Sequence, residues 1–299
     1  MFLSKNDLPS LRKYFSVELP SFSATELQSM LKQLVLKRFN WSEVDFMLNK
    51  DLLFSESDLL YFRSAVKRLQ KNEPFQHIIG EVEFYGVILK ADSRALIPRP
   101  ETEELVDWIL SGENLHQENR ILDLCSGSGC IAFALKSRLK ESIVDCVEWS
   151  PEAINLIEEN KKETGLNVNV LKMDVLSESS YSDFQEDFFD IWVSNPPYIP
   201  HSDKAVMSEN VLDFEPGMAL FVEDNAPFVF YNRIAQQGQR FLKEKGCLYF
   251  EIHENYAKEV MQILSDYNFV NIELRKDLQG KDRMIKAQKV SSRYESERS

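Results

Sequence analysis

The sequence of 299 residues is long enough for one large domain or two smaller ones, and its 43% hydrophobic and 28% charged residues are typical of a globular protein. Its 35 Lys and Arg against 48 Asp and Glu give a formal net charge of −13. This acidic balance argues against tight, nonspecific binding of duplex DNA, because such binding requires basic side chains that neutralise phosphates.

The start of the chain lacks the features of a secreted or membrane protein. Lys5 introduces charge before an apolar signal-peptide core could form, and no apolar run approaches the roughly 20 residues of a membrane span. The four cysteines contain no C-x-x-C pair and the four histidines are scattered, so neither shows metal-ligand spacing. We therefore expect a cytoplasmic protein with free thiols and no metal site.

Residues 1–75 are predicted to form a small helical domain. Apolar residues recur at helical spacing between Ser23 and Phe39, and again between Leu59 and Leu69, and Pro74 ends the second pattern. This segment holds 11 Lys and Arg against 9 Asp and Glu, so the rest of the chain carries a net charge of about −15. The helical domain is thus slightly basic in an acidic protein.

The next segments predict a linker and then a large α/β domain. Residues 76–96 alternate apolar and polar positions, which predicts a β-hairpin linker, and an arm with two prolines precedes a helix at 102–110. Strands and helices then alternate to about residue 290, before a polar tail at 291–299. The strands are expected at 120–124, 143–147, 167–171, 188–193, 247–252, 270–274 and 283–287. This alternation predicts a doubly wound, mostly parallel, seven-stranded sheet over residues 97–290.

The loop after the first of these strands has the spacing of a cofactor-binding loop. Glycines at such a position let the backbone bend tightly and let a ligand approach closely. Glu148 ends the next strand, where a carboxylate can bind both hydroxyls of a ribose. We therefore expect an adenosine-type cofactor here, with tight packing as the alternative, on the loop Cys125-Ser126-Gly127-Ser128-Gly129.

Two acidic residues bear on which cofactor binds, since the glycine loop alone does not separate NAD from S-adenosylmethionine. Asp123 precedes the loop, where its carboxylate suits a cationic sulfonium and amino-acid group but would repel a pyrophosphate. Asp174, next to Val175, follows the third strand and can accept a hydrogen from an adenine amino group. The alternative for Asp174 is a helix cap in a polar turn.

A second motif, Asn195-Pro196-Pro197-Tyr198, follows the buried strand predicted at 188–193. It therefore lies beyond the carboxyl end of a strand, where open α/β sheets bind ligands. The two prolines remove two backbone N–H donors, so an amide side chain, bare carbonyls and an aromatic ring remain. This set can hold a planar –NH2 group by accepting its two hydrogens, and it indicates an enzyme acting on an amide or amino nitrogen. A rigid proline turn begun by Asn is the alternative.

Together these motifs resemble the HemK/PrmC family of protein-(glutamine-N5) methyltransferases, which modify class 1 peptide chain release factors. The resemblance covers about residues 74–287 by motif, and the helical N-terminal domain agrees in kind. The Asn-Pro-Pro-Tyr element also occurs in DNA adenine and RNA guanine methyltransferases, whereas the proline arm and the last segment are more specific. The segments that carry the resemblance are Gln76-His77-Ile78-Ile79-Gly80, Leu96-Ile97-Pro98-Arg99-Pro100-Glu101-Thr102-Glu103, residues 123–129, Ser194 to Ile199, Phe214-Glu215-Pro216 with Ala219-Leu220, and Asp277-Leu278-Gln279-Gly280-Lys281-Asp282-Arg283.

The resemblance implies a Rossmann-like domain that transfers a methyl group from S-adenosylmethionine to a glutamine side-chain amide of a release factor. It implies that the Asn195 side-chain oxygen and the Pro196 carbonyl accept the two amide hydrogens, while Tyr198 packs against the acceptor plane. Arg99 and Glu101 would support the cofactor-site wall or the docked substrate loop, with a helix entry as the alternative. Glu215 would shape the far rim, with a structural turn as the alternative. The helical domain would dock the protein substrate, or only present solvated faces, and we expect a monomer.

Three residues depart from the family's usual pattern. Cys125 replaces a glycine in the cofactor loop, Glu148 replaces an aspartate, and His253 replaces a glycine in the segment Phe250-Glu251-Ile252-His253-Glu254. None of these changes removes a group that methyl transfer requires.

Other functions use some of the same motifs. A nucleic-acid methyltransferase could act on an exocyclic base amine with the same acceptor motif, but it would need a basic groove. A non-catalytic adenosine-binding regulator would be expected to have a damaged acceptor motif. A dehydrogenase would leave Asn195 and Tyr198 without a role.

Overall fold

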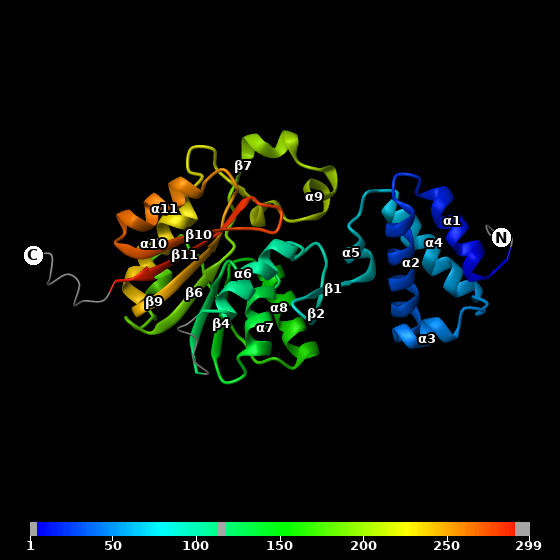
Figure 1. The fold of residues 1–299 in the computed structure, drawn as a ribbon, viewed down its shortest axis with the longest axis horizontal. Helices are drawn as coiled ribbons and strands as arrows, with labels where there is room; N and C mark the ends of the chain where they lie inside the picture. Colours follow the sequence, from blue (N-terminus) through cyan, green and yellow to red (C-terminus); the bar gives the residue numbers. More distant parts are fainter. Residues whose placement is uncertain (1–4, 113–117, 291–299) are drawn as a thin grey trace, which may run out of the picture. The chain divides into compact units, whose positions relative to one another are not determined.

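The computed structural model describes residues 5–112 and 118–290 (Figure 1), so the polar tail expected at 291–299 lies outside the described residues. The chain divides into two compact units. Unit 1 comprises residues up to Glu81 together with Ser208–Phe214, and unit 2 comprises Val82–Met207 and the chain from Glu215 onward.

Unit 1 is helical, and three of its helices begin at a serine whose side chain caps them. Ser23, Ser42 and Ser55 each accept a hydrogen bond from a backbone N–H three residues later, and an acidic side chain at that later position bonds back to the serine N–H. Phe15 and Phe62 lie fully buried in its apolar core. Its helices are α1 (Leu8–Glu18), α2 (Ala24–Phe39), α3 (Glu43–Leu48), α4 (Glu56–Leu69), α5 (Phe75–Ile79) and α9 (Glu209–Phe214).

The hairpin starts later than the alternating pattern predicts. Residues 75–79 form α5, which ends at Gly80 in a left-handed conformation (φ 79°), and the strands are β1 (Glu81–Phe84) and β2 (Val87–Lys90). Short apolar runs do not distinguish one helical turn from a strand, which explains the error. The two residues of the hairpin turn, Tyr85 (φ 49°) and Gly86 (φ 80°), both have the positive φ that a tight hairpin favours.

Unit 2 contains a seven-stranded sheet in the order β10-β11-β9-β6-β3-β4-β5, which confirms the predicted fold class. Five strands from β9 to β5 are parallel, and β11 is antiparallel to both of its neighbours. The strands are β3 (Arg120–Leu124), β4 (Ile143–Glu148), β5 (Asn169–Lys172), β6 (Phe189–Ser194), β9 (Leu242–Glu251), β10 (Phe269–Lys276) and β11 (Asp282–Lys289). A separate two-stranded sheet pairs β7 (Ile199–Pro200) with β8 (Phe221–Val222).

Each face of the large sheet has its own apolar core, covered by helices (Figure 1). One core holds residues of α6 (Pro100–Leu110), α7 (Cys130–Arg138) and α8 (Pro151–Thr164), and the other holds residues of α10 (Val229–Phe241) and α11 (Ala257–Asp266). Side chains of β3 alternate between them, with Ile121 in the first core and Leu122 in the second. Short 3-10 helices lie at Glu178–Tyr181, His201–Val206 and Gly217–Ala219.

The register of the central strands places three loops at one edge of the sheet. Leu124, the last residue of β3, pairs with Val147 of β4 and with Ser194 of β6. The loops that follow these residues therefore leave the sheet side by side, where parallel α/β sheets bind ligands.

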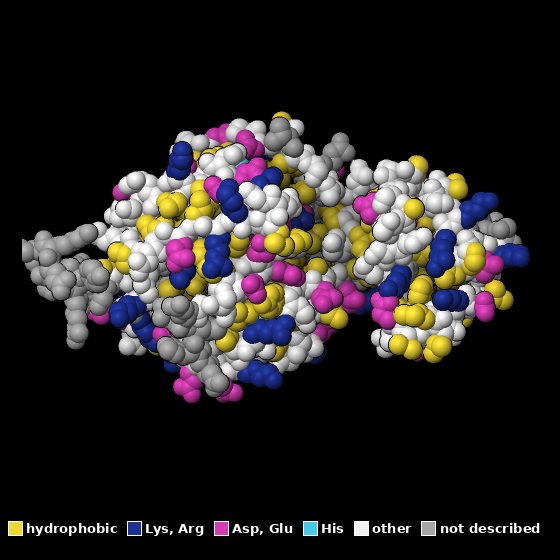
Figure 2. All heavy atoms as spheres, in the orientation of Figure 1, with side chains coloured by type: hydrophobic (Ala, Val, Ile, Leu, Met, Phe, Trp, Pro, Cys, Tyr) yellow, Lys and Arg dark blue, Asp and Glu magenta, His cyan; other side chains and the backbone are white. Residues whose placement is uncertain are grey.

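The surface carries charges of both signs. On the face drawn in Figure 2, Lys and Arg side chains are interspersed with Asp and Glu side chains, and the described residues there form no continuous basic band. Within the described ranges, no helix is both long and apolar enough to cross a membrane.

Candidate active site

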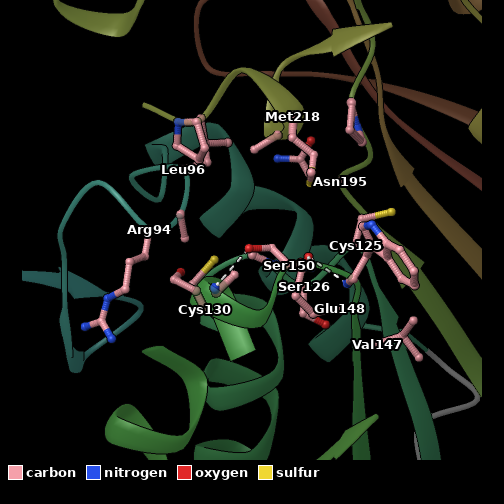
Figure 3. Close-up of a pocket in the computed structure, with 18 of the residues that line it drawn as sticks. Arg94, Leu96, Cys125, Ser126, Cys130, Val147, Glu148, Ser150, Asn195 and Met218 are labelled. Atoms are coloured by element: carbon pink, nitrogen blue, oxygen red, sulfur yellow. Dashed lines mark hydrogen bonds between the residues drawn. The ribbon is translucent and has the colours of Figure 1, made fainter. Parts of the chain in front are cut away.

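A cavity of about 690 Å³ opens at the carboxyl edge of the sheet, and all of its lining residues belong to unit 2 (Figure 3). In the close-up, Asn195 and Met218 lie on its upper side, and Glu148 and Val147 lie on its lower side. The predicted site residues that line it are Arg99, Cys125, Ser126, Gly127, Ser128, Glu148, Asp174, Val175, Asn195 and Pro197.

Six predicted residues are absent from this lining. Asp123 is fully buried, and Gly129, Pro196 and Tyr198 belong to the two motifs without lining the cavity. Glu215 is buried behind the arm, and Glu101 accepts a hydrogen bond from Gln279 at 3.3 Å.

Three residues of the cofactor loop have a left-handed backbone: Cys125 (φ 62°), Gly127 (φ 57°) and Gly129 (φ 78°). A Cβ atom on Gly129 would lie 2.9 Å from the ring of Phe133, so close packing requires glycine there. A Cβ atom on Gly127 would meet no described atom within 4 Å, although the residue lines the cavity. The loop thus leaves an open cradle for a ligand at Gly127. The left-handed backbone at Cys125 also explains the family's usual glycine there.

Glu148 is held by three backbone donors. Its carboxylate accepts hydrogen bonds from the N–H groups of Gly127 (2.8 Å), Trp149 (2.8 Å) and Ser150 (2.9 Å). These bonds fix the carboxylate at the cavity wall, and its remaining lone pairs can accept ligand hydroxyls.

Trp149 also lines the cavity, although it was not among the predicted site residues. Its side chain is 52% exposed, which is unusual for a large aromatic residue, and the Lys172 ammonium lies 5.8 Å from its ring centre. An aromatic residue directly after the acidic end of a strand was the signal that could have identified it.

Asp123 is fully buried on the α7 side of β3. Among the described residues, no donor makes a well-formed hydrogen bond to either carboxylate oxygen, although the nearby Ser126 hydroxyl and Ala132 N–H oppose the rise in its pKa. The Ser126 hydroxyl donates instead to the Asp123 backbone carbonyl at 2.8 Å. Burial raises the pKa of Asp123 to about 8. A buried, unpaired carboxyl group is costly, so this residue favours a site that receives positive charge.

The acceptor motif is tied to the sheet through Ser194, the residue that precedes it. The Ser194 hydroxyl donates a hydrogen bond to the Leu124 carbonyl at 2.7 Å, which ties the end of β6 to the end of β3. Asn195 follows directly and lines the cavity. Its Nδ2 donates a 3.4 Å hydrogen bond to the hydroxyl of Thr102 on α6.

Glu251, which was not among the predicted site residues, links Thr102 to Tyr198. Its Oε2 accepts from the Thr102 hydroxyl at 2.6 Å, and its Oε1 accepts from the Tyr198 hydroxyl at 3.3 Å. Glu251 is only 2% exposed, and burial raises its pKa while the hydrogen bond from Thr102 opposes that shift. No periodic or spacing signal reveals this residue, because its partners are distant in sequence.

The last segment of the resemblance lies next to this network. Asp277 accepts a 3.1 Å hydrogen bond from Nε of Arg283, which in turn donates to the Ile252 carbonyl at 3.4 Å. His253 replaces the usual glycine, and its ring centre lies 6.1 Å from that of Tyr198. Burial lowers the pKa of His253.

The proline arm is held by a buried carboxylate. Glu215 forms an ion pair with Arg99 and accepts a hydrogen bond from the Ile97 N–H at 3.1 Å. The Glu215 side chain is only 1% exposed, so the pair anchors the arm that forms one wall of the cavity.

Comparisons with known proteins agree with this geometry. Residues 14–80 match the family model of the PrmC N-terminal domain, and residues 106–214 match the methyltransferase small domain. A crystal structure of a methyltransferase from Pyrococcus furiosus has a similar fold, with a TM-score of 0.51 and 12% identity over 69% of this chain and 90% of that one.

Curated relatives extend the match over most of the chain. The release factor glutamine methyltransferase of Flavobacterium psychrophilum is 38% identical over 270 residues, which are 89% of this chain and 93% of the relative. The protein of the same name from Bacteroides thetaiotaomicron is 40% identical over 82% of this chain and 86% of its own length. Identity at this level over nearly whole chains establishes that the protein belongs to the family of release factor glutamine methyltransferases.

Proposed function

We propose that this protein transfers a methyl group from S-adenosylmethionine to the side-chain amide nitrogen of the glutamine in the Gly-Gly-Gln motif of class 1 peptide chain release factors. The observation that carries this proposal is the position of Asn195, which shares one cavity with the glycine loop and Glu148. The family to which the chain belongs points to the same reaction.

The residues of the cavity fit S-adenosylmethionine. The open space over Gly127 leaves room for a ligand against the backbone, and the unpaired Asp123 carboxyl favours a nearby cation. Glu148 would bind the ribose hydroxyls, Trp149 would cover the adenine ring, and Asp174 with Val175 would complete the adenine side. The bound cofactor supplies a sulfonium-activated methyl group.

An amide nitrogen is a poor nucleophile, because its lone pair is delocalised into the carbonyl. The residues of the acceptor motif would promote its attack on the methyl group. The Asn195 side-chain oxygen and the Pro196 carbonyl would accept the two N–H bonds of the substrate glutamine. These hydrogen bonds strengthen as the nitrogen gains positive charge, so they stabilise the transition state more than the ground state. Tyr198 would support the plane of the acceptor, and Arg99, Glu101 and Glu215 would shape the wall and rim.

The proposed reaction also assigns a role to each segment of the chain. Residues 1–75 would dock the release factor, 76–96 would link the two parts, and 97–290 would bind the cofactor and catalyse transfer. We propose a cytoplasmic monomer that forms no stable complex with nucleic acid. The interspersed charges on the face in Figure 2 and the net charge of −13 support the last point.

The test measures transfer from labelled S-adenosylmethionine to a purified class 1 release factor, to its Gly-Gly-Ala variant, and to total RNA and DNA. We expect label on the release factor only, and its loss in the Gly-Gly-Ala variant. Label on nucleic acid alone would overturn the proposal and identify an exocyclic base amine as the acceptor.

A further inference from the structure

We infer that Glu251, acting through Thr102, fixes the orientation of the Asn195 side-chain amide and thereby selects an acceptor that donates N–H bonds. This inference rests on the proposed function and deepens it. Glu251 and Thr102 are positioning residues, because they act through Asn195; Thr102 also lines the cavity, whereas Glu251 does not.

The hydroxyl of Thr102 has a single hydrogen. An ionised carboxylate can only accept hydrogen bonds, so the 2.6 Å contact with Glu251 Oε2 takes that hydrogen. The Thr102 oxygen then presents only lone pairs to its other neighbour, Asn195.

The state of Thr102 decides which way the Asn195 amide turns. An amide that faces lone pairs must present its –NH2 group, and the Asn195 Nδ2 accordingly donates to Thr102 Oγ1 at 3.4 Å. The carbonyl oxygen Oδ1 is the opposite arm of the same planar group, so it faces away from Thr102. Since Asn195 lines the cavity, the free arm is an acceptor. It can bind a substrate N–H and would repel a carbonyl oxygen.

Glu251 is itself held in place by hydrogen bonds, so the orientation that it gives to Asn195 through Thr102 is fixed. Its other oxygen accepts from Tyr198 at 3.3 Å, and its backbone carbonyl accepts from the Tyr231 hydroxyl at 3.0 Å. The residue ends β9, an inner strand of the sheet, and is 2% exposed. One buried carboxylate therefore positions both side chains of the acceptor motif that can contact a planar amide.

Three variants and a matched control test this relay, by which we mean the hydrogen bonds that run from Glu251 through Thr102 to Asn195. Thr102→Val removes the hydroxyl and keeps the shape, Thr102→Ser keeps the hydroxyl, and Glu251→Gln replaces the acceptor by a group that can also donate. Thr164→Val removes a hydroxyl that also makes two hydrogen bonds, to the Asn160 carbonyl and from the Leu166 N–H, at the end of α8. Each variant is assayed for kcat and KM with the release factor, for cofactor affinity and for thermal midpoint.

We expect Thr102→Val and Glu251→Gln to lower kcat by about 10- to 100-fold while cofactor affinity changes less than about twofold, since misplacing a reacting group has effects of this size. Thr102→Ser should restore most of kcat, and Thr164→Val should match the wild type. Unchanged kcat in Thr102→Val, or no recovery in Thr102→Ser, would overturn the inference.

A second measurement keeps the inference testable if a variant folds poorly or the substrate proposal fails. The side-chain 15N–1H signals of Asn195, assigned by their loss in Asn195→Ala, should exchange slowly in the wild type and quickly in Thr102→Val. Equal exchange in both proteins would overturn the orientation claim. A wild-type enzyme that leaves release factors unlabelled, yet shows slow Asn195 exchange, would instead refute only the proposed function.

Discussion

The backbone N–H of Gly127 donates a 2.8 Å hydrogen bond to the carboxylate of Glu148, which joins the loop after β3 to the end of β4. This bond shapes the cofactor cavity before any ligand binds, because both residues line it. Gly127 is therefore the position where an added side chain would report most directly on cofactor contact.

We predict that Gly127→Ala weakens S-adenosylmethionine binding by at least about tenfold, because its Cβ atom would project into the open cradle. The left-handed backbone should also cost about 1–2 kcal/mol of stability. Gly165→Ala is the matched control, since Gly165 is also left-handed (φ 69°) with no described atom within 4 Å of a Cβ, but lies outside the cavity. Calorimetric titration should show a loss of affinity only for Gly127→Ala, and equal affinities in the two variants would contradict the assignment.

Glu148→Ala should weaken cofactor binding and also destabilise the protein. The ribose would lose its acceptor, and three backbone N–H groups would lose theirs, at a cost of about 1–3 kcal/mol. Equilibrium dialysis and urea unfolding measure the two effects separately. Glu158→Ala, on an exposed position of α8, serves as the control. Unchanged affinity in Glu148→Ala would remove Glu148 from the cofactor site.

Asn195→Ala should abolish methyl transfer and leave cofactor affinity nearly intact. The side chain is expected to bind the acceptor amide, so its loss removes stabilisation that arises in the transition state. Single-turnover transfer and cofactor titration measure the two properties in one preparation. Asn169→Ala, which removes an exposed amide bonded to Asp145, should behave like the wild type. Retained turnover in Asn195→Ala would refute the proposed role.

Asp123 should make the cofactor-free protein less stable as pH rises. Its folded pKa of about 8 lies above the value of 3.8 for an unperturbed aspartate, so the folded state binds the proton more tightly. The stability from this group is complete below pH 4 and is lost as pH rises through 8. The free energy of unfolding of Asp123→Asn should therefore rise relative to that of the wild type by about 1.4 kcal/mol for each pH unit between about pH 4 and pH 8. Urea unfolding at pH 5 and pH 8 tests this, and a pH-independent difference would contradict it.

Protonation of Glu251 should lower kcat at acidic pH, which would appear as an acid limb in the pH profile of kcat. Its raised pKa means that the carboxylate gains a proton at a higher pH than an ordinary glutamate, and a protonated Glu251 can donate to Thr102 and reverse the relay. The charge of Arg283 on β11 opposes this protonation, whereas that of Glu101 on α6 favours it. Burial raises the pKa of Tyr198, so its hydroxyl stays neutral in this range. The kcat of Glu251→Gln should be low and lack this limb, and an identical limb in both enzymes would assign it to another group.

Much of the sheet could be predicted from the sequence because its strands are buried on both faces and appear as short apolar runs between helical patterns. β3 was predicted with its observed bounds, and β11 was predicted within two residues at each end. The helices α1, α3, α5 and α9 of unit 1 were not predicted individually. Three of them have only five or six residues, and the apolar face of α1 becomes evident only in the core of unit 1.

The residues of the candidate site also divide into those that local sequence patterns predict and those that only the folded structure brings together. Residues that follow strand ends, such as Gly127, Glu148 and Asn195, could be placed at one edge because parallel strands align their carboxyl ends. Glu251 and Thr102 could not be connected, because they are 149 positions apart and only the folded sheet brings them within a hydrogen bond. Local patterns therefore indicate which groups contact ligands, whereas the side chains that orient those groups depend on tertiary structure.

Glu148 and Asn195 line opposite sides of a single cavity (Figure 3). For inhibitor chemistry this means that one compact molecule can occupy both ends. An adenosine joined through a short, rigid tether to a primary carboxamide would present its ribose to Glu148 and its –NH2 group to Asn195. Because the two halves would bind as one ligand, the entropic cost of immobilising them would arise only once.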